Sequence, residues 1–182
     1  MQQHRRSIST VSVLSILVLV FSIVGAPVLR AQSAPLTDEQ RARVQAECAQ
    51  IKGSLSQLHA SDALLRVNRG QVYESLSSRL MVPFNARLSS AGLDNKAMTT
   101  HTTQYASALN SFRTHYIAYE QKLSEALRID CRKEPDTFYQ AVIDARELRN
   151  TVHADIEKLH AIITDYGTSV DDFYLNFKRL AE

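Results

Sequence analysis

The sequence predicts an all-α chain, an elongated antiparallel three-helix bundle of coiled-coil type that follows an N-terminal signal peptide or membrane anchor. Apolar residues recur at steps of three and four over long stretches, whereas strict alternation of apolar and polar residues is nearly absent. The three prolines beyond residue 33, Pro35, Pro83 and Pro135, divide the remaining chain into near-equal lengths. Short connections between long amphipathic segments favour antiparallel neighbours.

Residues 1–33 have the three parts of a secretory signal peptide. A basic start of His4, Arg5 and Arg6 precedes an apolar run from Val11 to Val24, and Ala31-Gln32-Ser33 offers small residues at a cleavage site after Ser33. An uncleaved anchor is the alternative, because the stretch 11–29 approaches the length that spans a bilayer. In both cases residues 34–182, expected to form a single helical-bundle domain, lie outside the cytosol. The expected location is therefore secreted or in the cell envelope.

The first helix is predicted over about 37–91. Thr37 and Gln40 have the spacing of a capping box, and Ala91-Gly92 has the composition of a helix end. Pro83 predicts a kink, because proline cannot donate the backbone hydrogen bond of a helix interior. The expected buried face consists of Val44, Cys48, Ile51, Leu55, Leu58, Leu65, Val72, Leu76 and Leu80.

Two further helices are predicted over 95–129 and 136–181. Asp94 is suited to cap the second helix, and Pro135 is suited to the first turn of the third. The second carries an apolar face that includes Tyr105 and Phe112, and the third carries one from Phe138 to Leu180.

The two cysteines, Cys48 and Cys131, are expected to form one disulfide if the chain enters an oxidising compartment. If the chain turns between about 82 and 95, antiparallel pairing brings Cys131 within a helical turn of Cys48. Two unrelated buried thiols are the alternative.

Charged residues interrupt the apolar faces at Asp62 and Arg149. The same antiparallel register places these two side chains at one level, where they could form an ion pair inside the bundle. Arg66 and Arg69 lie at that level too, opposite acidic residues of the third helix that include Asp155. We predict a polar layer that fixes the helix register, made of Asp62, Arg66, Arg69, Arg149 and Asp155. In the alternative reading the helices rotate locally and all of these groups are solvated.

His153, Glu157 and His160 share one helix face at steps of four and three, and form a weak candidate metal site. They contain a single Glu-x-x-His, whereas di-iron bundles use that motif twice with two further glutamates. A solvated helix face is the favoured interpretation. No metal and no cofactor is predicted.

The motifs of several enzyme classes are absent from the sequence, namely a nucleophile elbow, a phosphate-binding glycine loop and zinc-protease or cysteine-protease signatures. Three of the 21 basic residues lie in residues 1–33, so the remainder carries 18 basic and 19 acidic residues and a net charge of −1. Such a chain has no electrostatic preference for nucleic acid, and membrane contact is expected only through the N-terminal segment. We predict a non-enzymatic exported protein that acts through contacts with other proteins or through self-association.

Aromatic residues near the apolar faces indicate core packing. If the bundle is thin or splayed, however, those rings would line an amphipathic groove suited to a helix or an unfolded chain. Residues 170–182 are expected to extend beyond the second helix and to need residues 84–91, or a partner, to cover them. The predicted partner-binding residues are Phe173, Tyr174, Phe177 and Leu180.

The stretch Leu36-Thr37-Asp38-Glu39-Gln40-Arg41 resembles the Leu-Thr-x-x-Gln motif of small periplasmic helical chaperones of the Spy and CpxP type. The resemblance covers six residues, and the second copy of the motif is missing here. It implies an all-helical dimer whose cradle binds unfolded clients. A periplasmic holdase is therefore an alternative function, and a metal-binding or enzymatic helical bundle is another.

Overall fold

The computed structural model describes residues 35–181, and every regular element in that range is helical. The elements are α1 (Asp38–Ala46), α2 (Cys48–Ser75), a π-helical segment η1 (Leu76–Met81), α3 (Val82–Ser90), α4 (Lys96–Arg128) and α5 (Pro135–Ala181). The all-α prediction is confirmed for these residues, none of which lies in a strand. The predicted signal peptide or anchor lies outside the described residues.

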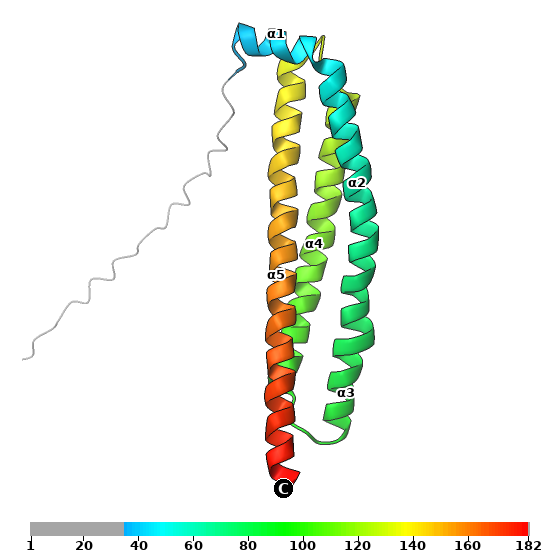
Figure 1. The fold of residues 1–182 in the computed structure, drawn as a ribbon, viewed down its shortest axis with the longest axis vertical. Helices are drawn as coiled ribbons and strands as arrows, with labels where there is room; N and C mark the ends of the chain where they lie inside the picture. Colours follow the sequence, from blue (N-terminus) through cyan, green and yellow to red (C-terminus); the bar gives the residue numbers. More distant parts are fainter. Residues whose placement is uncertain (1–34, 182) are drawn as a thin grey trace, which may run out of the picture. The chain divides into compact units, whose positions relative to one another are not determined.

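The prediction of one continuous helix over 37–91 is wrong, because the helix breaks at Glu47. Glu47 leaves helical geometry, with φ −92° and ψ 5°, and α2 begins at the next residue. α1 therefore lies across the ends of α2 and α5 and does not continue the line of α2 (Figure 1). No sequence signal at Glu47 marks this corner.

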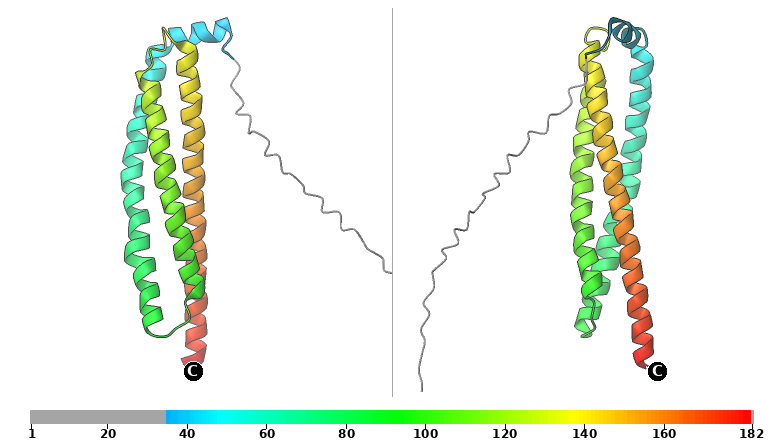
Figure 2. Two further views of the ribbon diagram at one scale, coloured as in Figure 1. Left: turned by 180° about the vertical axis from the view of Figure 1, so that it is seen from behind. Right: turned by 90° about the vertical axis from the view of Figure 1, so that its left-hand side faces the viewer.

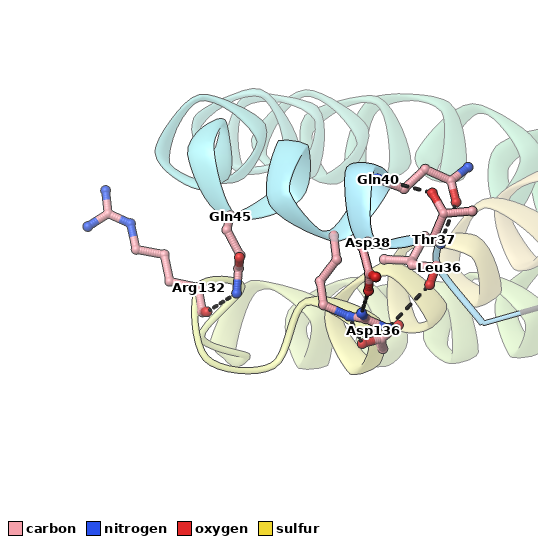
Figure 3. Close-up of polar contacts among 8 residues, drawn as sticks. Leu36, Thr37, Asp38, Gln40, Gln45, Arg132 and Asp136 are labelled. Carbon is pink, nitrogen blue, oxygen red and sulfur yellow. Dashed lines mark hydrogen bonds and ion pairs between the residues drawn. The ribbon is translucent and has the colours of Figure 1, made fainter.

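Polar contacts hold α1 in place. The capping box is present, since the Gln40 backbone N–H donates to Thr37 Oγ1 at 3.2 Å and the Thr37 N–H donates to Gln40 Oε1 at 2.9 Å. Arg41 Nε donates to Asp136 Oδ2 at 2.8 Å, and this bond holds the pKa of the Asp136 carboxyl below its usual range. Gln45 Nε2 donates to the carbonyl of Arg132 at 2.9 Å (Figure 3). The hydrogen bonds of Arg41 and Gln45 thus connect α1 to residues around the start of α5.

A π-helical turn precedes Pro83. Proline lacks a backbone N–H and its ring clashes with the carbonyl four residues earlier, so an α-helix cannot pass through it unchanged. Here the Val82 N–H donates to the carbonyl of Ser77, five residues back, and Pro83 becomes the second residue of α3. The wider turn accommodates the proline at the place where the sequence predicts a kink.

The long helices α2, α4 and α5 lie side by side in all three views (Figures 1 and 2). α4 and α5 are in contact along most of their lengths, while α2 packs mainly against α4. α4 and α5 start and end within one residue of the predicted bounds. Gly92, whose φ is +69°, makes the turn between α3 and α4. The core between these helices contains Tyr105, Phe112, Leu123, Leu159 and Tyr166.

The buried face of α2 and η1 differs from the expected one. Leu65 and Val72 of α2 and Leu80 of η1 are each more than half exposed, whereas Tyr73 of α2 and Met81 of η1 are buried. The Tyr73 ring packs edge-on against Phe112, with the ring centroids 5.8 Å apart. Because successive residues of a helix point about 100° apart, the burial of Tyr73 leaves its neighbour Val72 facing outward. The apolar stripe of α2 therefore faces partly outward.

Candidate functional site

The Cys48–Cys131 disulfide joins the first residue of α2 to the loop before α5, with a Cα–Cα distance of 5.6 Å. Both cysteines are buried beside Phe138. The disulfide predicted from the sequence is present, and it is consistent with an oxidising environment outside the cytoplasm. It fixes the corner between α1 and α2 to the start of α5.

Asp62 and Arg149 form an ion pair between α2 and α5, with Arg149 Nε donating to Asp62 Oδ2 at 2.7 Å. Tyr119 of α4 donates its hydroxyl to the same oxygen at 2.7 Å. The Asp62 side chain is 11% exposed and that of Arg149 49%, so the carboxylate is more deeply placed than the guanidinium. Burial alone would raise the pKa of Asp62, but the hydrogen bonds from Arg149 and Tyr119 outweigh it and hold this pKa below its ordinary value.

Arg66 and Arg69 line the same groove as the Asp62–Arg149 pair, but their expected pairing with Asp155 of α5 is wrong. Asp155 pairs with His115 of α4, at 2.6 Å from Oδ2 to Nδ1, and neither arginine forms an ion pair within residues 35–181. Arg66 instead lies over two aromatic rings of α4, with its guanidinium carbon 5.5 Å from the centroids of both Phe112 and Tyr116. This cation–π contact places the guanidinium over α4.

Gly70 makes room for that arrangement. It is buried, and a Cβ atom built at this position would overlap Arg66 Nη1. A glycine inside a long helix costs stability relative to alanine, by about 1 kcal/mol. Here its missing side chain lets the guanidinium of Arg66 lie across the helix backbone and reach the rings.

An open groove of about 380 Å³ runs between α2 and α5 over a floor supplied by α4. Its floor is aromatic, with Phe112, Tyr116 and Tyr119, and Leu65 and Ile156 line its sides. The Asp62–Arg149 pair connects α2 and α5 at one end of the lining residues. The Tyr73 hydroxyl, 3.0 Å from His160 Nε2, connects the same two helices at the other end. From Asp62 to Tyr73 α2 rises about 16 Å, so the groove is about three helical turns long. The remaining lining residues are Arg66, Arg69, Asn150, Val152 and His153.

The predicted partner-binding residues fall at the C-terminal end of α5. Phe173, Phe177 and Leu180 line a second hollow, of about 390 Å³, together with residues 93–98. The rings of Phe173 and Phe177 stack with centroids 6.1 Å apart. Phe177 is 50% exposed and Leu180 is 88% exposed, so residues 93–98 cover them only in part. Tyr174 is 62% exposed and does not line this hollow.

The candidate metal residues do not converge on one point. His153 Nδ1 lies 3.3 Å from Glu157 Oε1 on the exposed side of α5, while His160 turns toward Tyr73. Within residues 35–181 no group of three or more His, Cys, Asp or Glu side chains could hold a metal ion. These residues therefore form an exposed His153–Glu157 pair and a separate His160–Tyr73 hydrogen bond.

A buried polar cluster around Asn85 was not foreseen from the sequence. Tyr166 of α5 donates its hydroxyl to Asn85 Oδ1 at 3.0 Å, and Asn85 Nδ2 donates to Thr102 Oγ1 of α4 at 2.8 Å. Asn95 Nδ2 donates to the Asn85 carbonyl at 2.7 Å. The sequence feature that could have indicated this cluster is Asn85 itself, a polar amide residue just after Pro83 on an otherwise apolar helix face. The cluster ties α3 to α4 and α5.

Comparisons with protein-family models, with curated proteins and with solved structures found no match to this chain. None of the helices that the structure describes is long and apolar enough to cross a membrane.

Proposed function

We propose that this chain is an exported, non-enzymatic protein that acts by binding other proteins, or a second copy of itself, in the cell envelope or outside the cell. In this proposal residues 1–33 direct export, and α2, α4 and α5 act as an elongated antiparallel three-helix bundle. The disulfide supports the extracytoplasmic location.

One observation carries the binding role, namely the exposed apolar end of α5. Phe177 and Leu180 keep 50% and 88% of their surface accessible beside a hollow that residues 93–98 fill only in part. Large apolar side chains grouped on an otherwise polar surface are typical of protein–protein contact sites. We define the C-terminal surface as Phe173, Phe177 and Leu180.

Photo-crosslinking tests this role in the cells that export the protein. A photoreactive amino acid at Phe177 is expected to give a discrete adduct, whose mass distinguishes a second copy of the chain from another protein. The matched control is the same amino acid at Thr168, which is exposed on the same helix outside the C-terminal surface. Equal labelling from both positions, or none from Phe177, would count against the proposal.

A holdase role is the second candidate, and the outward apolar side chains of α2 favour it. Leu64, Val67 and Val72 are each more than half exposed on that helix, and exposed apolar surface is what an unfolded client would contact. The test is the light scattering of a reduced, aggregating client protein. Suppressed scattering at an equal or lower molar ratio of this protein to the client supports the holdase role. Unchanged scattering at a severalfold excess of this protein would contradict that role.

Intact-mass analysis tests the export part of the proposal. The mature product is expected to begin at Ala34 and to gain two hydrogens on reduction, one for each cysteine. A product that retains residues 1–33 would indicate the anchor instead.

A further inference from the structure

We propose that the groove between α2 and α5 is a binding site for a small amphiphilic carboxylate, such as a fatty acid, whose chain lies on the aromatic floor and whose carboxylate meets Arg66 and Arg69. This site is separate from the C-terminal surface. It adds a ligand to the proposed protein-binding role and does not depend on that role.

The charges around the groove favour an anion. Asp62 is the one carboxylate among its lining residues, and the Arg149 ion pair already compensates it. Arg66 and Arg69 line the same groove without an ion pair or hydrogen bond to any residue in the range 35–181. A carboxylate bound there would receive charge-assisted hydrogen bonds from guanidinium donors that have no protein acceptor.

Arg66 is already positioned for this role. Its guanidinium carbon lies 5.5 Å from the ring centroids of both Phe112 and Tyr116, so the cation is held against the floor of the groove. A guanidinium carries five N–H donors, and those of Arg66 donate to no acceptor in the range 35–181, so they are available to a ligand. Gly70 permits this position because a side chain there would displace the guanidinium.

The floor and the ends of the groove favour a small ligand over a polypeptide. Phe112, Tyr116 and Ile156 provide an apolar surface for a hydrocarbon chain. The Asp62–Arg149 and Tyr73–His160 contacts connect α2 and α5 at the two ends of the lining residues, so a polypeptide lying between the helices along the whole groove would have to displace them. The volume of about 380 Å³ lies within the range of small-molecule sites, whereas a helix of about 10 Å diameter needs more space.

Titration calorimetry with dodecanoate, below the concentration at which it forms micelles, tests the site on the disulfide-bonded chain. Dodecanol and dodecyltrimethylammonium are the neutral and cationic comparison ligands. We expect one dodecanoate per chain, with binding at least about tenfold weaker for dodecanol and for the cation.

Two pairs of variants locate the binding. Leu65→Glu places a carboxylate at the groove, and Leu64→Glu makes the same change on the neighbouring residue, which is more exposed and does not line the groove. Arg66→Gln removes a proposed partner of the carboxylate, and Arg87→Gln removes an exposed arginine of α3 outside the groove. We expect Leu65→Glu and Arg66→Gln each to weaken dodecanoate binding about tenfold or more, with both controls unchanged.

Several results would overturn the proposal. They are the absence of dodecanoate binding, equal binding of dodecanol, and equal effects of the groove variants and their controls. Binding of an acidic amphipathic peptide in place of dodecanoate would also overturn it, since the site would then be a peptide groove. Because every variant substitutes an exposed or half-buried residue, circular dichroism of each is expected to match that of the parent chain.

Discussion

Replacing Asp62 by alanine should destabilise the protein far more than replacing an exposed aspartate. Asp62 accepts hydrogen bonds from Arg149 of α5 and from Tyr119 of α4, so its carboxylate links all three long helices. Alanine at this position leaves both donors without their acceptor.

The structure indicates how large the effect should be. Arg149 is about half exposed and can be rehydrated, so its lost ion pair should cost at most about 1 kcal/mol. Tyr119 is 2% exposed, and a buried hydroxyl left without a partner costs about 1–3 kcal/mol. We therefore expect Asp62→Ala to lower the free energy of unfolding by about 1–4 kcal/mol.

Urea denaturation followed by circular dichroism measures this change. The matched control is Asp165→Ala, an exposed aspartate of α5, for which we expect a change within about 0.5 kcal/mol. Tyr119→Phe separates the two contributions, because in that background no hydroxyl is left without a partner and Asp62→Ala should cost only about 1 kcal/mol. An Asp62→Ala variant as stable as the Asp165→Ala control would refute the buried position of Asp62.

Three further predictions concern pH, the disulfide and α1. Because the pKa of Asp62 is lowered in the folded protein, its contribution is fully present above its ordinary value and is lost as pH falls through the folded value. The stability difference between the parent and Asp62→Ala should thus persist at neutral pH and shrink in acid below pH 3.8, and a difference that grew in acid would contradict this sign. Replacing both Cys48 and Cys131 by serine should lower the free energy of unfolding by about 4–5 kcal/mol, since the disulfide closes a loop of 83 residues; urea denaturation compared with that of the disulfide-bonded parent checks it, and the reduced parent should match the serine variant. Arg41→Gln should speed amide hydrogen exchange in α1 but not in α4, because Arg41 connects α1 to Asp136; unchanged exchange in α1 would show that other contacts hold it.

Much of the fold could be predicted from the sequence. The steps of three and four identified α4 and α5 to within one residue, since long amphipathic patterns bounded by Gly92 and Pro135 leave little freedom. The antiparallel register brought Asp62 near Arg149 and Cys48 near Cys131, as the structure has them.

The corner at Glu47 and the buried face of α2 could not be predicted in this way. The corner depends on contacts of α1 with residues 132–136, which are distant in sequence. Tyr73 is buried in place of Val72 because its ring packs against Phe112 and its hydroxyl contacts His160. The apolar stripe of α2 includes both neighbours, so the sequence pattern alone does not determine which of them faces the core.

The candidate sites were predicted less completely than the fold. Phe173, Phe177 and Leu180 do lie together, because they share one face of a helix that has no full cover there. The sequence predicts that Arg66 pairs with an acidic residue of α5. In the structure its guanidinium lies over rings of α4 instead, in space that the absence of a side chain at Gly70 leaves open. The sequence shows where an arginine charge lies along a helix, but it does not show against which neighbouring residues the arginine side chain packs.

Nuclear Overhauser contacts of the Tyr73 ring test the central structural claim most directly, because α2, α4 and α5 meet at this residue. Its ring centroid lies 5.8 Å from that of Phe112 and 5.8 Å from that of His160. We expect cross-peaks from the Tyr73 ring protons to the ring protons of both residues in the folded, disulfide-bonded protein. A folded protein whose Tyr73 ring shows neither cross-peak would contradict the helix arrangement on which the groove and its proposed ligand depend.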